Sequence, residues 1–76
     1  MPRIAPSANG IEFYVYADDH SPPHVHAYYA EHEVLLVIAS AEVYAGGLPR
    51  PQLAESQAWL RANRPTAMAA WNRLNP

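Results

Sequence analysis

The stretch GGLP, residues 46–49, divides the chain into two parts whose apolar residues repeat with different periods. Before it, apolar and polar residues alternate, as in IEFYVYA over residues 11–17, and this is the two-residue period of a half-buried strand. After it, apolar residues recur at steps of three and four, the spacing of a helix that buries one face. The change of period predicts an α+β domain in which the strands precede the helices.

The first part is predicted to form an antiparallel β-meander of three to four strands over about residues 11–45. Asn9-Gly10 is a turn signal before the first strand. Pro22-Pro23 ends that strand, because proline donates no hydrogen bond to a ladder. The later strands are expected in HVHAYYA, in EVLLVIA over residues 33–39 and in a short segment around 42–44, with a tight connection at Glu31-His32.

The second part is predicted to form two helices, at about residues 51–63 and 65–74. Pro51 and Pro65 stand where the first turn of a helix tolerates proline, and Pro65 also ends the first helix. The expected apolar stripes are Leu53, Ser56, Trp59 and Leu60 in the first helix, and Ala67, Trp71 and Leu74 in the second. Packed on one face of the sheet, the helices complete a single domain over residues 1–76, whose other sheet face is left to solvent, a partner or self-association.

Composition excludes several classes of protein and site. Cysteine is absent, so a disulfide framework and a thiolate metal site are both excluded. No run approaches the roughly 20 apolar residues that span a bilayer, and the opening segment lacks the apolar core of a signal peptide, so we expect a cytoplasmic protein without membrane contact. The net charge is -2, lysine is absent and four of the five arginines follow residue 49, which weakens any general attraction for phosphate.

Four residues around the double proline form the candidate site: Asp19, His20, His24 and His26. On a strand, His24 and His26 project to the same face, and a turn through the prolines would bring His20 and Asp19 back towards them. Three imidazoles and a carboxylate suit a divalent transition metal such as Zn²⁺, Mn²⁺, Ni²⁺ or Fe²⁺. The spacing therefore predicts a candidate metal or active site made of these four residues.

Two other interpretations use the same residues without a metal. In one, a histidine acts as general acid or base in RNA cleavage, Asp19 fixes its tautomer, and Arg50, Arg61 or Arg64 supplies positive charge. In the other, the histidines are structural and His24 and His26 are simply exposed strand residues or interface residues. In every interpretation His32 is a solvated turn residue, and Glu31 and Glu33 are solvent-facing charges of the hairpin.

The order of motifs along nearly the whole chain resembles the bacterial domain-of-unknown-function family DUF4160. The resemblance rests on a strand followed by Asp-His-x-Pro-Pro-His-x-His, on a Gly-x-Leu-Pro turn and on helices with tryptophan. These features map onto Asp19, His20, Pro22, Pro23, His24 and His26, onto Gly46 or Gly47 with Leu48 and Pro49, and onto Trp59 and Trp71.

The resemblance implies a small bacterial protein encoded beside another small protein, in pairs that resemble toxin-antitoxin modules. The functional prediction is therefore a toxin-antitoxin-like module in which Asp19, His20, His24 and His26 form the active or ligand-binding surface, for RNA cleavage or metal binding. The expected partner is a cognate small protein from a neighbouring gene or a second copy of the chain. The alternative is a non-catalytic protein-interaction domain, an antitoxin or adaptor, whose histidines are structural.

Overall fold

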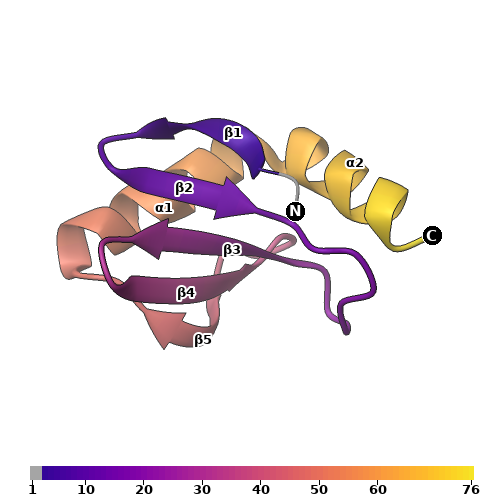
Figure 1. Ribbon diagram of the computed structural model, residues 1–76, viewed down its shortest axis with the longest axis horizontal. Coiled ribbons are helices and arrows are strands. Elements are labelled where there is room, and N and C mark those ends of the chain that lie inside the picture. Colours follow the sequence, from indigo (N-terminus) through magenta and orange to yellow (C-terminus); the bar gives the residue numbers. More distant parts are fainter. Residues whose placement is uncertain (1–2) are drawn as a thin grey trace.

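The strands form one antiparallel sheet in the order β1-β2-β3-β4-β5, shown in Figure 1. The computed structural model describes residues 3–76, with side chains from residue 9 onward. The strands are β1 (Arg3–Ala8), β2 (Ile11–Tyr14), β3 (His24–Tyr29), β4 (His32–Val37) and β5 (Val43–Gly47). Each strand pairs with its neighbour in sequence, so the predicted β-meander is confirmed.

Strand β1 adds a fifth strand that the sequence analysis did not predict. It lies at the edge of the sheet and pairs with β2 through a register with two irregularities. Its sequence, RIAPSA, contains Pro6, which argues against a central strand but is compatible with an edge strand, where one side of the backbone needs no ladder partner. The edge position explains why pattern alone missed it.

The last strand begins and ends later than predicted, at Val43 and Gly47. Gly46 belongs to this strand and has a positive φ of 72°. A side chain there would place its Cβ 2.4 Å from the Glu33 carbonyl oxygen of β4. The glycine is therefore needed for the close pairing of β4 and β5, where the sequence had indicated only an exit from the sheet.

The helices α1 (Arg50–Ala62) and α2 (Arg64–Leu74) lie within about one residue of their predicted bounds and begin with proline in the first turn. Asn63 separates them, and its side-chain amide donates to the Trp59 carbonyl at 2.8 Å. In residues 3–76, neither helix is long and apolar enough to cross a membrane.

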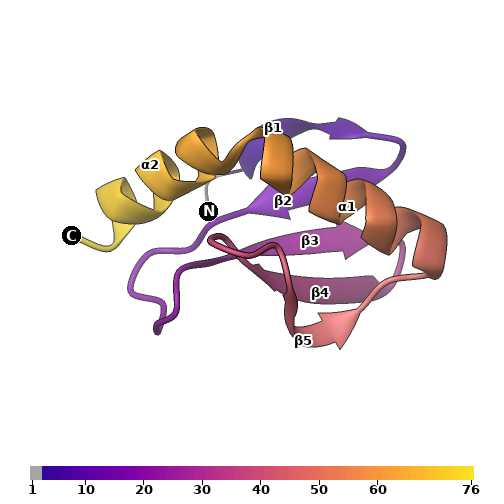
Figure 2. The ribbon, with the colours of Figure 1, turned by 180° about the vertical axis from the view of Figure 1, so that it is seen from behind.

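The core lies between the sheet and the helices, and Figure 2 shows α1 running across this face of the sheet. Phe13 of β2 stacks on Trp59 of α1, with ring centroids 4.1 Å apart. The buried hydrophobic residues are Ile11, Phe13, Val15, Val25, Ala27, Val34, Leu36, Ile38, Ala41, Leu60, Ala67, Ala70 and Trp71. Ser56 is also buried, and Leu53, Trp59 and Leu74 pack against this cluster, so the predicted helical stripes do face the core. The α+β architecture with two C-terminal helices on one face is confirmed.

Candidate functional site

The connection between β2 and β3 places Asp19 beside the start of β3. Asp18 adopts a left-handed backbone conformation with φ 56°, which aspartate tolerates better than most residues. The next residue, Asp19, donates its backbone N–H to the side-chain oxygen of Asn75 at 2.9 Å. The same asparagine donates to the Tyr16 carbonyl at 3.0 Å, so the end of α2 holds both ends of this turn.

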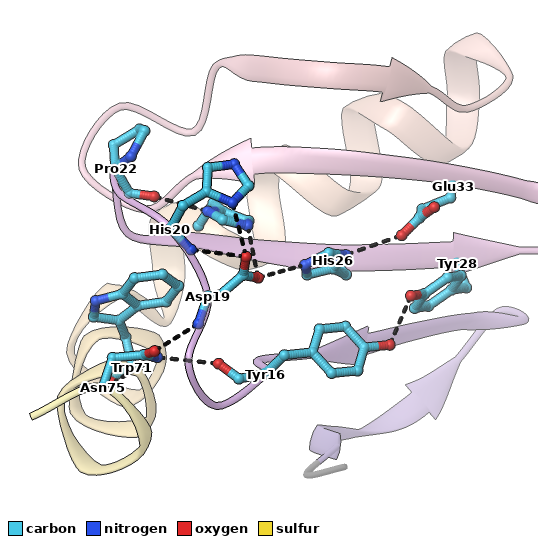
Figure 3. A network of polar contacts seen from close by, with 10 residues as sticks. Tyr16, Asp19, His20, Pro22, His26, Tyr28, Glu33, Trp71 and Asn75 are labelled. Atoms are coloured by element: carbon cyan, nitrogen blue, oxygen red, sulfur yellow. Dashed lines mark hydrogen bonds and ion pairs between the residues drawn. The ribbon is translucent and has the colours of Figure 1, made fainter.

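The carboxylate of Asp19 lies at the centre of the predicted cluster, as Figure 3 shows. Its Oδ2 atom is 3.1 Å from Nε2 of His24 and 3.1 Å from Nε2 of His26. Its Oδ1 atom accepts the backbone N–H of His20 at 2.9 Å and lies 3.1 Å from Nδ1 of the same histidine. One oxygen therefore faces the two strand histidines, and the other faces the turn.

His24 is fully buried, so the expectation of an exposed strand residue was wrong. The reason is its position at the beginning of β3, where the Asp19 turn and the indole of Trp71 cover it; the two ring centroids are 5.2 Å apart. Its Nδ1 lies 2.7 Å from the Pro22 carbonyl oxygen, and because that oxygen only accepts, Nδ1 carries the proton. Nε2 is buried and makes no hydrogen bond among the described residues, although it points at Asp19.

His26 is also largely covered, with 13 % of its side chain exposed, so it too departs from the predicted exposed strand residue. Val25 and Ala27 on either side of it face the core, so His26 points to the opposite face of the sheet. Its Nδ1 lies 2.9 Å from Glu33 Oε2, and its Nε2 lies 3.1 Å from Asp19 Oδ2. Both ring nitrogens therefore meet carboxylates.

Glu33 is a member of the site that the sequence analysis missed. It was expected to be only a solvent-facing charge; its side chain is 44 % exposed, yet it contacts His26. The cause is register: Tyr29 pairs with His32, so the connection is Ala30-Glu31 and not Glu31-His32. The predicted connection would place Val37 opposite His26 and Glu33 on the same face but farther along the strand, whereas the observed register places Leu35 opposite His26 and Glu33 diagonal to it. Ala30-Glu31 has none of the glycine or asparagine residues that favour a two-residue hairpin turn, so the sequence held no signal for this register.

Two tyrosines extend the network from Glu33. The hydroxyls of Tyr16 and Tyr28 are 2.7 Å apart, and the Tyr16 ring meets the His26 ring edge-on with centroids 4.5 Å apart. Burial, the hydrogen bond with Tyr16 and the neighbouring Glu33 carboxylate all raise the pKa of the Tyr28 phenol far above its ordinary value. Tyr28 therefore stays protonated and supports Glu33 as a hydrogen-bond donor.

The remaining predicted residues lie around or away from the cluster. His20 is two-thirds exposed, with 66 % of its side chain accessible; its Nδ1 lies 3.1 Å from the outer oxygen of Asp19, and its ring centroid is 5.4 Å from that of His24. His32 was predicted to be a turn residue, but it is the first residue of β4 and pairs with Tyr29; its side chain lies 3.6 Å from Glu31, on the exposed part of the hairpin. Arg64 donates to the Ile38 carbonyl at 3.2 Å. Arg50 and Arg61 belong to α1, which covers the face of the sheet opposite His26.

The two carboxylates that contact His26 are both held in the ionised form. Burial acts to raise the pKa of Asp19, but hydrogen bonds from His26 and the His20 N–H, with the charges of His24 and His26, outweigh it and lower the pKa below the ordinary value. The hydrogen bond from His26 lowers the pKa of Glu33; burial opposes this, and Tyr28 and the charge of His26 add to the lowering. The site is thus built around two anions.

We expect the metal-free protein to lose stability in acid as these two carboxylates become protonated. A carboxyl whose folded pKa is lowered contributes stability that is present above its unfolded pKa, about 3.9 for aspartate and 4.3 for glutamate, and that is lost as pH falls through the folded pKa. Urea unfolding midpoints measured between pH 7 and pH 3 should fall mainly below about pH 4.3. The fall should be shallower for Glu33→Gln; an equally steep fall would exclude Glu33 as a contributor.

The geometry brings together three of the four predicted site residues with ligand atoms suited to a metal. One nitrogen each of His24 and His26 and one oxygen of Asp19 all lie within 4.8 Å of one another. The predicted fourth ligand, His20, stands beside this group and not within it. The three residues in this arrangement are called the Asp19–His24–His26 centre below.

Comparison with known families matches residues 10–72 to the family described as a domain of unknown function (DUF4160), a range that includes the whole Asp19–His24–His26 centre and Glu33. Comparisons with curated proteins and with solved structures give no significant match. The matched range covers most of the 76 residues and agrees with the motifs that carried the resemblance. The chain belongs to the DUF4160 family.

Proposed function

We propose that the Asp19–His24–His26 centre binds a divalent transition metal ion and leaves coordination positions open for water or a substrate. The observation that carries the proposal is the buried Nε2 of His24, which points at a carboxylate oxygen and has no hydrogen bond among the described residues. When His24 is neutral and its proton is on Nδ1, Nε2 and the Asp19 oxygen are two hydrogen-bond acceptors that face each other, which is unfavourable in a buried place. A cation between them satisfies both.

The second contacts of the two histidines favour a metal over a purely structural cluster. Nδ1 of His24 faces the Pro22 carbonyl, and Nδ1 of His26 faces the Glu33 carboxylate. Metal-binding histidines characteristically donate their other ring N–H to a carbonyl or a carboxylate, which fixes the tautomer and aims the free nitrogen at the ion. Both histidines have this arrangement, with Nε2 directed at the shared centre.

The distances from Asp19 to the two histidines are compatible with shared coordination. Two atoms bound at about 2.1 Å to one Zn²⁺ lie about 3.0 to 3.4 Å apart along an octahedral or tetrahedral edge. The distance from Asp19 Oδ2 to each histidine Nε2 is 3.1 Å. The same contacts fit a metal-free protein in which a proton on His26 bridges to Asp19, and an entering ion would replace that proton.

Two nitrogens and one carboxylate oxygen favour Zn²⁺, Mn²⁺, Fe²⁺ or Ni²⁺ over Ca²⁺ or Mg²⁺, which prefer oxygen ligands. Three protein ligands are the usual number in catalytic metal sites, where the ion acidifies a bound water or polarises a substrate. His20 contacts the outer oxygen of Asp19 and is largely exposed. From there it can exchange protons with the bound water or substrate.

Zinc titration of the purified, chelator-treated protein tests the proposal. We expect saturable binding of about one equivalent per chain at pH 7, weaker at pH 5 because the ion must displace a proton. Calorimetry measures the stoichiometry, and the absorption spectrum of the Co²⁺ form reports nitrogen and oxygen ligands. His32→Ala is the matched control, since His32 lies outside the centre, and it should bind as the wild type does. Absence of saturable binding by any of Zn²⁺, Co²⁺, Mn²⁺ or Ni²⁺ would contradict the proposal and favour the structural interpretation.

The toxin-antitoxin role, RNA cleavage and a cognate small protein or a second copy as partner stay predictions. RNA cleavage was predicted to use positive charge from Arg50, Arg61 or Arg64. Arg50 and Arg61 lie on α1, and Arg64 donates to the Ile38 carbonyl, so the three arginines lie in other surroundings than the histidines. The metal proposal depends on none of these roles, so it is tested first.

A further inference from the structure

The side chain of Asn75, the residue that follows α2, makes three hydrogen bonds, two of which join the end of the helix to the turn containing Asp19. Its Oδ1 accepts the Asp19 backbone N–H at 2.9 Å. Its Nδ2 donates to the Tyr16 carbonyl at 3.0 Å and to the Trp71 carbonyl at 3.2 Å. Figure 3 shows Asn75 on the helix side of the turn, below Asp19.

These bonds decide where the Asp19 carboxylate can point. The side chain of aspartate has only two rotatable bonds, so the position of its oxygens follows closely from the position of its backbone. Asn75 fixes the backbone on both sides of the turn, at Tyr16 and at Asp19. The carboxylate then reaches Nε2 of both histidines at 3.1 Å.

The same turn of α2 also supports the second ligand. Trp71, whose carbonyl oxygen accepts hydrogen bonds from both the backbone N–H and the side-chain amide of Asn75, packs its indole against the His24 ring. One helical turn, residues 71–75, therefore contacts two of the three ligands, and these contacts span more than 45 positions of sequence. The contacts between this turn and the two ligands therefore depend on the tertiary structure and not on closeness in the sequence.

We propose that the last turn of α2 controls the metal affinity of the Asp19–His24–His26 centre, with Asn75 as the positioning residue for Asp19. The inference rests on the proposed metal-binding function. It assigns to Asn75 a role in binding although the residue offers no ligand atom to the ion. It also makes the docking of this turn a point of regulation, since a change that releases the turn lowers metal affinity.

The test compares zinc affinity and the Co²⁺ spectrum in four proteins: wild type, Asn75→Ala, Asn75→Asp and Asn72→Ala. Asn72 is the matched control, because it is the same residue type in the same helical turn and is exposed. We expect Asn75→Ala to weaken zinc binding by about 10-fold or more, the size of effect seen for outer contacts of metal ligands. Asn72→Ala should bind as the wild type does. Asn75→Asp keeps an acceptor for the Asp19 N–H but loses the donors to the Tyr16 and Trp71 carbonyls, so it should weaken zinc binding too, by less than Asn75→Ala does.

The outcomes separate this inference from the function on which it rests. Failure of the wild type to bind metal overturns the proposed function and the inference together. Binding by the wild type with equal affinity in Asn75→Ala overturns the inference and leaves the function standing. If Asn75→Ala does not fold, Asn75→Asp decides: weaker zinc binding than in Asn72→Ala supports positioning by Asn75, and affinity equal to that of the wild type contradicts it. A changed Co²⁺ spectrum in Asn75→Ala, at unchanged thermal stability, supports altered ligand geometry.

Discussion

Replacement of Asp19 by asparagine is expected to weaken zinc binding by more than about 100-fold, beyond the range typical of outer contacts. The change keeps the size of the side chain and the backbone N–H that Asn75 holds. It removes the negative charge and the strong acceptor that face both Nε2 atoms at 3.1 Å. A neutral amide is a much poorer ligand for a divalent cation than a carboxylate. Calorimetric titration of zinc into both proteins at pH 7 measures the difference.

Asp18→Asn is the control for this substitution. It removes the same charge from the neighbouring position, which is exposed and does not belong to the group of three ligands. Its zinc affinity should remain close to that of the wild type, apart from a small loss of general attraction that salt screens. Equal losses in the two variants would mean that charge near the turn, and not coordination by Asp19, governs binding.

Truncation of Trp71 to alanine is expected to destabilise the fold by about 3 to 5 kcal/mol, the usual cost of removing a large buried aromatic side chain. Trp71 is 5 % exposed and lies in the core, with its ring against His24. A domain of this size has a total stability of only about 5 to 15 kcal/mol at most, so the variant should be partly unfolded at 25 °C. Urea unfolding followed by circular dichroism measures the loss.

The fluorescence of Trp59, the other tryptophan, provides an independent probe in the Trp71→Ala protein. Because Trp59 stacks on Phe13 of β2, its signal reports the packing of α1 on the sheet. Trp71→Phe should recover much of the stability, since it refills most of the volume. An unchanged unfolding midpoint in Trp71→Ala would show that the end of α2 does not contribute to the cooperative core.

The metal interpretation and the structural interpretation differ in what they require of His24. A structural histidine buried at this position would be expected to satisfy both of its nitrogens, as buried polar groups generally do. In this protein Nδ1 is satisfied by Pro22, and Nε2 is not satisfied by any described residue. This asymmetry is the reason that we favour an ion.

Periodicity along the chain determined the architecture. The alternation in IEFYVYA, the apolar run of 33–39 and the helical spacing of Leu60, Ala67 and Trp71 are local properties, and each selects an element and the face that it buries. Strand β1 was not predicted because its proline and its irregular pairing weaken the local pattern of a strand. The motif between Asp19 and His26 likewise predicted that the two histidines gather on one face, because two residues two positions apart on a strand share a face.

Only the tertiary structure decided which residues complete the candidate site. Glu33 contacts His26 because the hairpin turns one residue earlier than predicted, and register depends on pairing between strands that no single strand specifies. Asn75 and Trp71 contact Asp19 and His24 because α2 packs against the turn, although these pairs are more than 45 residues apart in the sequence. The burial of His24, and with it the unsatisfied nitrogen that points to a metal, exists only when the turn, the strand and the end of α2 pack together and exclude water.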